Sequence, residues 1–126
     1  MALQVTTIML GVADIDRAKR FYLDLGAEVE QDVPGFVKFS LGAGSSSLAL
    51  YDRAAAAAEA GVPAEGSGFR GVSFHHIVGD RAQVDAMMER ALAAGATTAK
   101  AAAEVGWGYY GYFADPDGYL WKVACG

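Results

Sequence analysis

Two stretches near opposite ends of the chain decide how it folds: LGVADIDRAKRFYLDLG at residues 10–26 and GYFADPDGYLW at residues 111–121. In the first stretch, Asp14 is a typical N-cap, apolar side chains follow at helical spacing, and Gly26 is a typical helix end. In the second, Asp-Pro-Asp-Gly at 115–118 is a strong turn sequence between two β-prone segments. Together they predict a helix packed on a sheet early in the chain and a hairpin at its end.

The order of expected elements repeats once along the chain. The first half is expected to contain a strand at 3–12, a helix from Asp14 to Gly26, and strands at 27–31, 36–41 and 46–51. The second half is expected to contain a strand at 69–78, a helix from Asp80 to Gly95, and strands at 96–102, 107–114 and 119–124. The two caps lie 66 residues apart, about half the chain. This spacing predicts a duplicated βαβββ unit, at about 3–51 and 69–124, joined by an alanine-rich and glycine-rich linker at about 52–68.

Length and charge limit the classes of function. A chain of 126 residues, 53% of them hydrophobic, is expected to form a single domain covering 1–126. Ten Lys and Arg against fifteen Asp and Glu give a net charge of −5, so nucleic acid and anionic membranes are poor partners. The N-terminal residues resemble no secretory signal, and no apolar run reaches the ~18 residues that span a bilayer. We therefore expect a soluble cytoplasmic protein.

Both stretches also carry a family resemblance. Residues 10–26, with Phe21 and Tyr22, resemble the opening signature of the vicinal oxygen chelate superfamily, and residues 111–121 resemble its closing signature. This superfamily includes glyoxalase I, bleomycin-resistance proteins and extradiol dioxygenases. The resemblance covers essentially the whole chain and implies an α+β fold in which two βαβββ units form curved mixed sheets around a cleft. In members that react with substrates, His, Glu or Gln side chains from the first and last strands of each unit hold a divalent metal.

The metal-ligand positions that the resemblance implies carry unsuitable residues here. These positions fall at Thr7, Ala49, Ser73 or Phe74, and Lys122. A divalent cation prefers carboxylate or imidazole donors, and the ammonium of Lys122 repels a cation. The sequence therefore predicts no bound metal and no cofactor.

Aromatic residues, one histidine and one lysine are the candidate ligand-binding residues: Phe36, Phe39, His76, Trp107, Tyr110, Tyr112 and Lys122. Strand alternation separates the rings at 107–113 into two sets, of which one packs in the core and the other lines a flat apolar site. Which set is which stays open at this point. His76 is either a half-buried strand histidine or a hydrogen-bond donor or base, and Lys122 is either in a structural ion pair or the partner of an acidic ligand.

Two functions follow from these residues. The first is a metal-free binding protein of the drug-sequestration type, which takes a small aromatic or apolar, and in one version anionic, compound. The alternative is a metal-dependent or metal-independent lyase, isomerase or dioxygenase of the same superfamily, in which His76 or a tyrosine acts as acid–base and Lys122 holds an anion. In both cases the expected partners are a small molecule and a second copy of the chain.

Overall fold

The computed structural model describes residues 2–66, 68–70 and 72–126. The first part of the chain, up to Glu65, contains β1 (Thr7–Val12), α1 (Ile15–Asp24), β2 (Glu28–Val33), β3 (Phe36–Ser40), β4 (Ser47–Asp52) and α2 (Arg53–Ala60). The second, from Gly66, contains β5 (Ser73–Ile77), α3 (Arg81–Ala94), β6 (Thr97–Val105), β7 (Gly108–Ala114) and β8 (Leu120–Cys125). We call these two parts the first and the second unit.

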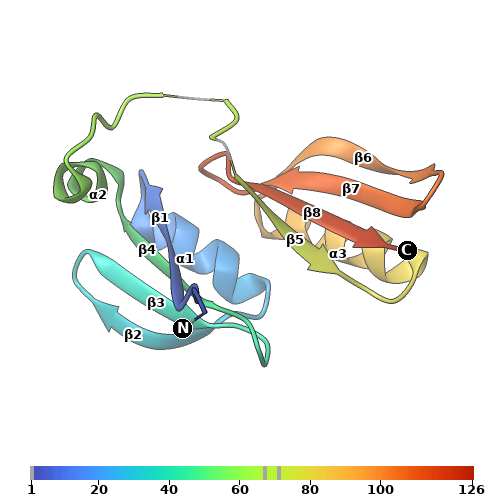
Figure 1. Ribbon diagram of the computed structural model, residues 1–126, viewed down its shortest axis with the longest axis horizontal. Helices are drawn as coiled ribbons and strands as arrows, with labels where there is room; N and C mark the ends of the chain where they lie inside the picture. Colours follow the sequence, from blue (N-terminus) through green and yellow to red (C-terminus); the bar gives the residue numbers. More distant parts are fainter. Residues whose placement is uncertain (1, 67, 71) are drawn as a thin grey trace. The chain divides into compact units, whose positions relative to one another are not determined.

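The two units have the same sheet topology. The first sheet has the strand order β1-β4-β3-β2 and the second has the order β5-β8-β7-β6. In each, the first strand pairs in parallel with the last one, and the other neighbours are antiparallel. Figure 1 shows α1 lying along the first sheet and α3 along the second. The predicted α+β fold of two βαβββ units is therefore confirmed.

The long helix of each unit begins at the aspartate that the sequence indicated. The Asp14 carboxylate accepts a hydrogen bond from the backbone N–H of Arg17 at 3.0 Å, and the Asp80 carboxylate accepts one from Gln83 at 2.8 Å. Each bond satisfies a backbone N–H group that has no partner within the helix. Both helices also end at a glycine with a positive φ, Gly26 or Gly95, as the sequence predicted.

Each unit has its core between its sheet and its long helix. In the first unit, the buried residues of α1 are Ala18, Phe21 and Tyr22, and those of the strands include Leu10, Val12, Val37, Phe39, Leu48 and Leu50. In the second unit, α3 buries Val84, Met88 and Ala91, and the strands bury Phe113 and Val123. One face of each sheet is thus covered by its own helix. We call the other face the open face.

The strands differ from the expected ranges mainly at their ends. β1 begins at Thr7 rather than at residue 3, because its partner β4 begins only at Ser47. β5 begins at Ser73, opposite Leu120, where β8 begins. Of the expected ranges, Ser67 in the linker and Gly71 in the strand at 69–78 lie outside the described residues. β6 continues to Val105 because it pairs with β7 along that length.

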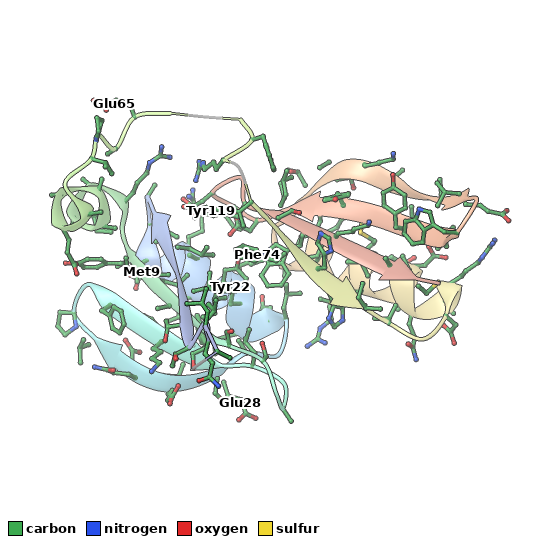
Figure 2. All side chains as sticks on the ribbon, in the orientation of Figure 1. Met9, Tyr22, Glu28, Glu65, Phe74 and Tyr119 are labelled. Atoms are coloured by element: carbon green, nitrogen blue, oxygen red, sulfur yellow. The ribbon has the colours of Figure 1, made fainter. Side chains whose placement is uncertain are left out.

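The turn at 115–118 positions β8 against β7. Asp115 is buried, and its carboxylate accepts the backbone N–H groups of Asp117 and Tyr119 at 3.0 and 2.8 Å. The guanidinium of Arg70 donates to the Asp117 carbonyl at 2.8 Å and lies 4.6 Å from the ring centre of Tyr119, which is labelled in Figure 2. These contacts hold the turn and place Tyr112 opposite Lys122.

None of the helices described is long and apolar enough to cross a membrane.

Candidate ligand-binding face

The packing of α3 decides which tyrosines of β7 lie on the open face. Tyr109 donates a hydrogen bond from its hydroxyl to the carboxylate of Asp85 on α3 at 2.7 Å, and Phe113 is fully buried. These two side chains therefore lie on the α3 side of the sheet. Because successive strand residues alternate in direction, Tyr110 and Tyr112 lie on the open face.

The structure brings four of the predicted ligand-binding residues together on this face. Trp107, in the turn between β6 and β7, stacks on Tyr110 with ring centres 5.3 Å apart and an interplanar angle of 13°. Tyr112 meets Tyr110 edge to face at 6.0 Å. The Lys122 ammonium lies 4.7 Å from the ring centre of Trp107 and 4.8 Å from that of Tyr110. These distances are within the range of cation–π attraction.

Lys100 on β6 is a fifth member that the sequence analysis missed. Its ammonium donates to the hydroxyl of Tyr110 at 2.8 Å and lies 4.8 Å from the ring centre of the same residue. Its position as the one basic residue in an alanine-rich strand was the available signal. We call these five residues, Lys100, Trp107, Tyr110, Tyr112 and Lys122, the aromatic face.

The two lysines of the aromatic face have no carboxylate partner in an ion pair within the described part of the chain. The ion pairs of Lys19 with Asp32 and of Arg81 with Glu104, for example, involve neither lysine. Lys122 therefore has aromatic partners where a structural ion pair would need a carboxylate. Two cations without acidic partners are a locally positive feature on a protein of net charge −5.

The neighbouring tyrosines Tyr109 and Tyr110 are perturbed in opposite directions. The hydrogen bond from Lys100, together with the charges of Lys100 and Lys122, lowers the pKa of Tyr110, although partial loss of hydration opposes this shift. The hydrogen bond to Asp85 and partial desolvation raise the pKa of Tyr109, because both favour its neutral form. The two pKa values shift in opposite directions because Tyr109 meets a carboxylate on one face of β7 and Tyr110 meets an ammonium group on the other.

The remaining predicted ligand-binding residues are not part of the aromatic face. His76 is exposed rather than half-buried. It is opposite Val123 and so points to the α3 side by alternation, whereas His75 is opposite Lys122 and shares its face. Phe39 is fully buried, with its ring 6.2 Å from Tyr22, so it belongs to the core of the first unit. Phe36 is half-buried, with its ring 6.3 Å from Tyr51, on the open face of the first sheet.

The metal-ligand positions implied by the family resemblance do not provide a donor set. Ala49 is fully buried and has only a methyl group, and Thr7 has only a hydroxyl. The ring centre of Phe74, labelled in Figure 2, lies 4.8 Å from a ring centre of Trp121, and both side chains are on the α3 side. Ser73 rather than Phe74 therefore shares the face of Lys122. Within the described ranges, no three His, Cys, Asp or Glu side chains are grouped so as to hold a metal ion. The chemistry of these positions does not fit the divalent metal of the reactive members.

A hollow of about 710 Å³ lies in the first unit, and none of the residues of the aromatic face lines it. Four of its lining residues are aspartates, at 14, 16, 32 and 52. Asp14 and Asp52 accept backbone N–H groups at the starts of α1 and α2, and Asp32 forms an ion pair with Lys19. Three of the four carboxylates thus already have structural partners. We therefore place the candidate site on the aromatic face.

The fold and the candidate site define a class of protein: paired βαβββ units with an aromatic and cationic face in place of metal donors. The family model described as the Glyoxalase/Bleomycin resistance protein/Dioxygenase superfamily matches residues 4–123. The chain belongs to this superfamily.

Solved structures agree with this assignment. A glyoxalase-related enzyme from Fulvimarina pelagi is 28% identical, with a TM-score of 0.86 over 99% of this chain and 89% of that one. A lactoylglutathione lyase from Agrobacterium tumefaciens is 26% identical, with a TM-score of 0.71 over 98% of this chain and 93% of that one. A superfamily protein from Burkholderia phytofirmans PsJN, 22% identical with a TM-score of 0.85 over 98% of each chain, shows the fold alone. No curated protein sequence matches the chain.

Proposed function

We propose that this protein is a metal-free binding protein that sequesters or carries a flat aromatic anion on its aromatic face. The observation that carries the proposal is the Lys122 ammonium, which lies 4.7 and 4.8 Å from the ring centres of Trp107 and Tyr110 and has no carboxylate partner in an ion pair among the described residues. A ligand carboxylate supplies the missing negative charge.

The shape and exposure of the aromatic face suit a planar ligand. Trp107 is 54% exposed, so an added ring has apolar surface on which to stack. An anionic group beside that ring would meet Lys122 and Lys100, and the positive charges of both lysines would attract it. A charge-assisted hydrogen bond in such a place contributes about 1–3 kcal/mol of binding free energy. The contribution of Phe36, on the first unit, stays a prediction.

Calorimetric titration with naphthoate, a flat aromatic carboxylate, tests this proposal. The Lys122→Met variant should bind naphthoate more weakly by about 1–3 kcal/mol and keep its fold. Naphthylmethanol, which has the same rings and no charge, should bind wild type and variant alike. Lys19→Met removes a lysine of α1 in the first unit, which is not part of the aromatic face, and should leave naphthoate affinity unchanged. Equal affinity of wild type and Lys122→Met for naphthoate would refute the role of Lys122.

The absence of metal is part of the same proposal. It rests on Thr7, Ala49 and Lys122, which offer a hydroxyl, a methyl and an ammonium at positions where reactive members have donors. Elemental analysis after dialysis against a mild chelator should find no stoichiometric zinc, nickel, iron or manganese. A near-stoichiometric metal after this treatment would contradict it.

We also propose that the chain acts as a homodimer in the cytoplasm. Large apolar side chains remain exposed on the strands of both units, among them Met9 at 44% and Ile77 at 66%, and a second copy would cover such surface. Sedimentation at micromolar concentration should show a dimer, and a monomer under these conditions would overturn this part of the proposal.

A further inference from the structure

A row of basic side chains crosses the open face of the second sheet. The strand register places Lys100 on β6 opposite Tyr112 on β7. Tyr112 is opposite Lys122 on β8, which in turn is opposite His75 on β5. Each strand thus contributes one residue to the row, and three of the four have basic side chains. None of the described strand residues that the register places on this face is acidic, so the face attracts anions.

The two ammonium groups of this row converge on the ring of Tyr110. Each of them lies 4.8 Å from the ring centre, and Lys100 also donates to the hydroxyl at 2.8 Å. Two like charges that approach one group repel each other, and an anion between them removes this repulsion. Lysine side chains are flexible, so both ammonium groups can turn toward the same anionic group. The pair therefore fits an anion with more than one negative charge better than a single carboxylate.

The hydroxyl of Tyr110 is a third donor for the same anion. Lys100 donates to this hydroxyl, and an ammonium group has no lone pair with which to accept a bond in return. The hydroxyl proton is therefore directed away from Lys100, where a ligand oxygen can accept it. The two lysines also lower the pKa of Tyr110, which makes its hydroxyl a stronger donor. Two ammonium groups and one hydroxyl thus offer hydrogen bonds beside the exposed ring of Trp107.

A tetrahedral dianion matches these donors more fully than a planar carboxylate does. A phosphate monoester carries close to two negative charges near neutral pH, and it has three oxygens that accept strong hydrogen bonds. A carboxylate has one charge and two oxygens. Three donors, of which two are cations, therefore correspond to the phosphate group both in number and in charge.

We propose that the ligand of the aromatic face is a phosphate monoester of a flat aromatic alcohol. Its ring stacks on Trp107, and its phosphate accepts hydrogen bonds from Lys100, Lys122 and the hydroxyl of Tyr110. The inference rests on the proposed function for the place where the ring binds, and it names the acidic group that the ligand carries. Lys100 is then the residue that selects a doubly charged group, because Lys122 alone already balances a single charge.

Calorimetric titration at pH 7.5 with three probes tests this assignment. Naphthyl phosphate has the rings and a doubly charged tetrahedral group, whereas naphthalenesulfonate has the same rings and a tetrahedral group with one charge. The wild type should bind naphthyl phosphate at least about fivefold more tightly than naphthalenesulfonate, because the second charge strengthens the hydrogen bonds from both lysines. Inorganic phosphate, which has no ring to stack on Trp107, should bind at least about tenfold more weakly than naphthyl phosphate.

Two substitutions and one control test the role of Lys100. Lys100→Met should weaken the binding of naphthyl phosphate about fivefold and that of naphthoate less than about twofold, because Lys122 still balances a single charge. Lys100→Arg keeps the charge and should retain the preference for naphthyl phosphate over naphthalenesulfonate. Tyr109→Phe removes a hydroxyl from the opposite face of β7 and should leave all these affinities unchanged. Lys100 is exposed, so its substitution should preserve the fold, which circular dichroism checks.

The outcomes separate the inference from the function on which it rests. Equal affinity of the wild type for naphthyl phosphate and naphthalenesulfonate, or unchanged binding of naphthyl phosphate in Lys100→Met, would overturn the phosphate assignment. Inorganic phosphate that binds as tightly as naphthyl phosphate would also overturn it, because the ring would then contribute nothing. If naphthoate still binds the wild type in a Lys122-dependent way, the proposed binding function stands. Failure of the wild type to bind either naphthoate or naphthyl phosphate would overturn the binding function itself.

Discussion

The open faces of the two sheets differ far more than the topology of the units. Both units have the same strand order, an aspartate N-cap on the long helix and a helix-covered face of apolar residues. The open face of the first sheet carries Lys38 opposite the buried Ala49, with Phe36 opposite Tyr51. The second open face carries the aromatic face with its two lysines. The fold thus constrains the residues of the helix side in both units and leaves those of the open side free to differ.

The largest expected effect separates the helix side from the open side. Phe21→Ala and Phe113→Ala each remove a fully buried ring and should lower the free energy of unfolding by about 3–5 kcal/mol. Trp107→Ala, on the aromatic face, should cost about 1 kcal/mol or less. Denaturant titration of the three variants measures the difference. A cost for Trp107→Ala as large as that of either phenylalanine would mean that the aromatic face is part of the core.

A smaller effect tests the likeness of the two helix starts. Asp14→Ala and Asp80→Ala each remove one side-chain bond to a backbone N–H, and each should lower the free energy of unfolding by about 1 kcal/mol. Glu65→Ala, which removes an exposed carboxylate from the loop after α2, is the control and should change stability little. Thermal unfolding measures the loss of stability in each variant. A large difference between the two losses would show that the two units do not depend equally on their helix caps.

The smallest expected effect distinguishes the two faces of β7 at alkaline pH. The folded pKa of Tyr110 is lowered, so its ionisation stabilises the fold above the pKa of the unfolded chain, and this contribution is lost as pH falls through the folded pKa. The folded pKa of Tyr109 is raised, so its contribution is complete below the unfolded pKa and is lost as pH rises through the folded pKa. Relative to wild type, Tyr110→Phe should therefore lose stability only at alkaline pH, and Tyr109→Phe should lose it at neutral pH.

Absorbance titration of tyrosinate checks the same assignment directly. Tyr110→Phe should remove an early step of the titration, and Tyr109→Phe should remove a late one. If both variants lose the same step, the two hydroxyls do not differ as their hydrogen-bond partners require.

Much of the scaffold could be predicted because its signals are local. Asp14 and Asp80 with their glycine ends locate the helices, and the turn at 115–118 locates the final hairpin, since capping and turn geometry depend on a few neighbouring residues. The strand ends were less accurate, as at β1 and β5, because a strand extends only as far as its partner does.

The candidate site was predicted in part. Trp107, Tyr110, Tyr112 and Lys122 were indicated by their density and by the departure of Lys122 from the metal-binding pattern. Lys100 was missed because it reaches Tyr110 from β6, whose pairing with β7 contains two register shifts that no sequence pattern announces.

The sequence by itself determined the repeated units, the helix starts and the lack of metal donors at the expected positions, because each of these depends on residue type and spacing. Only the tertiary structure decided which side of each strand is the open face. Alternation divides β7 and β5 into two sets of side chains, but both sets contain aromatic or polar residues, so neither is marked as the core set. The packing of α3 buries Phe113 and Val123. Alternation then puts Tyr110, Lys122 and His75 on the open face, whereas His76, which is also exposed, points to the other side of β5.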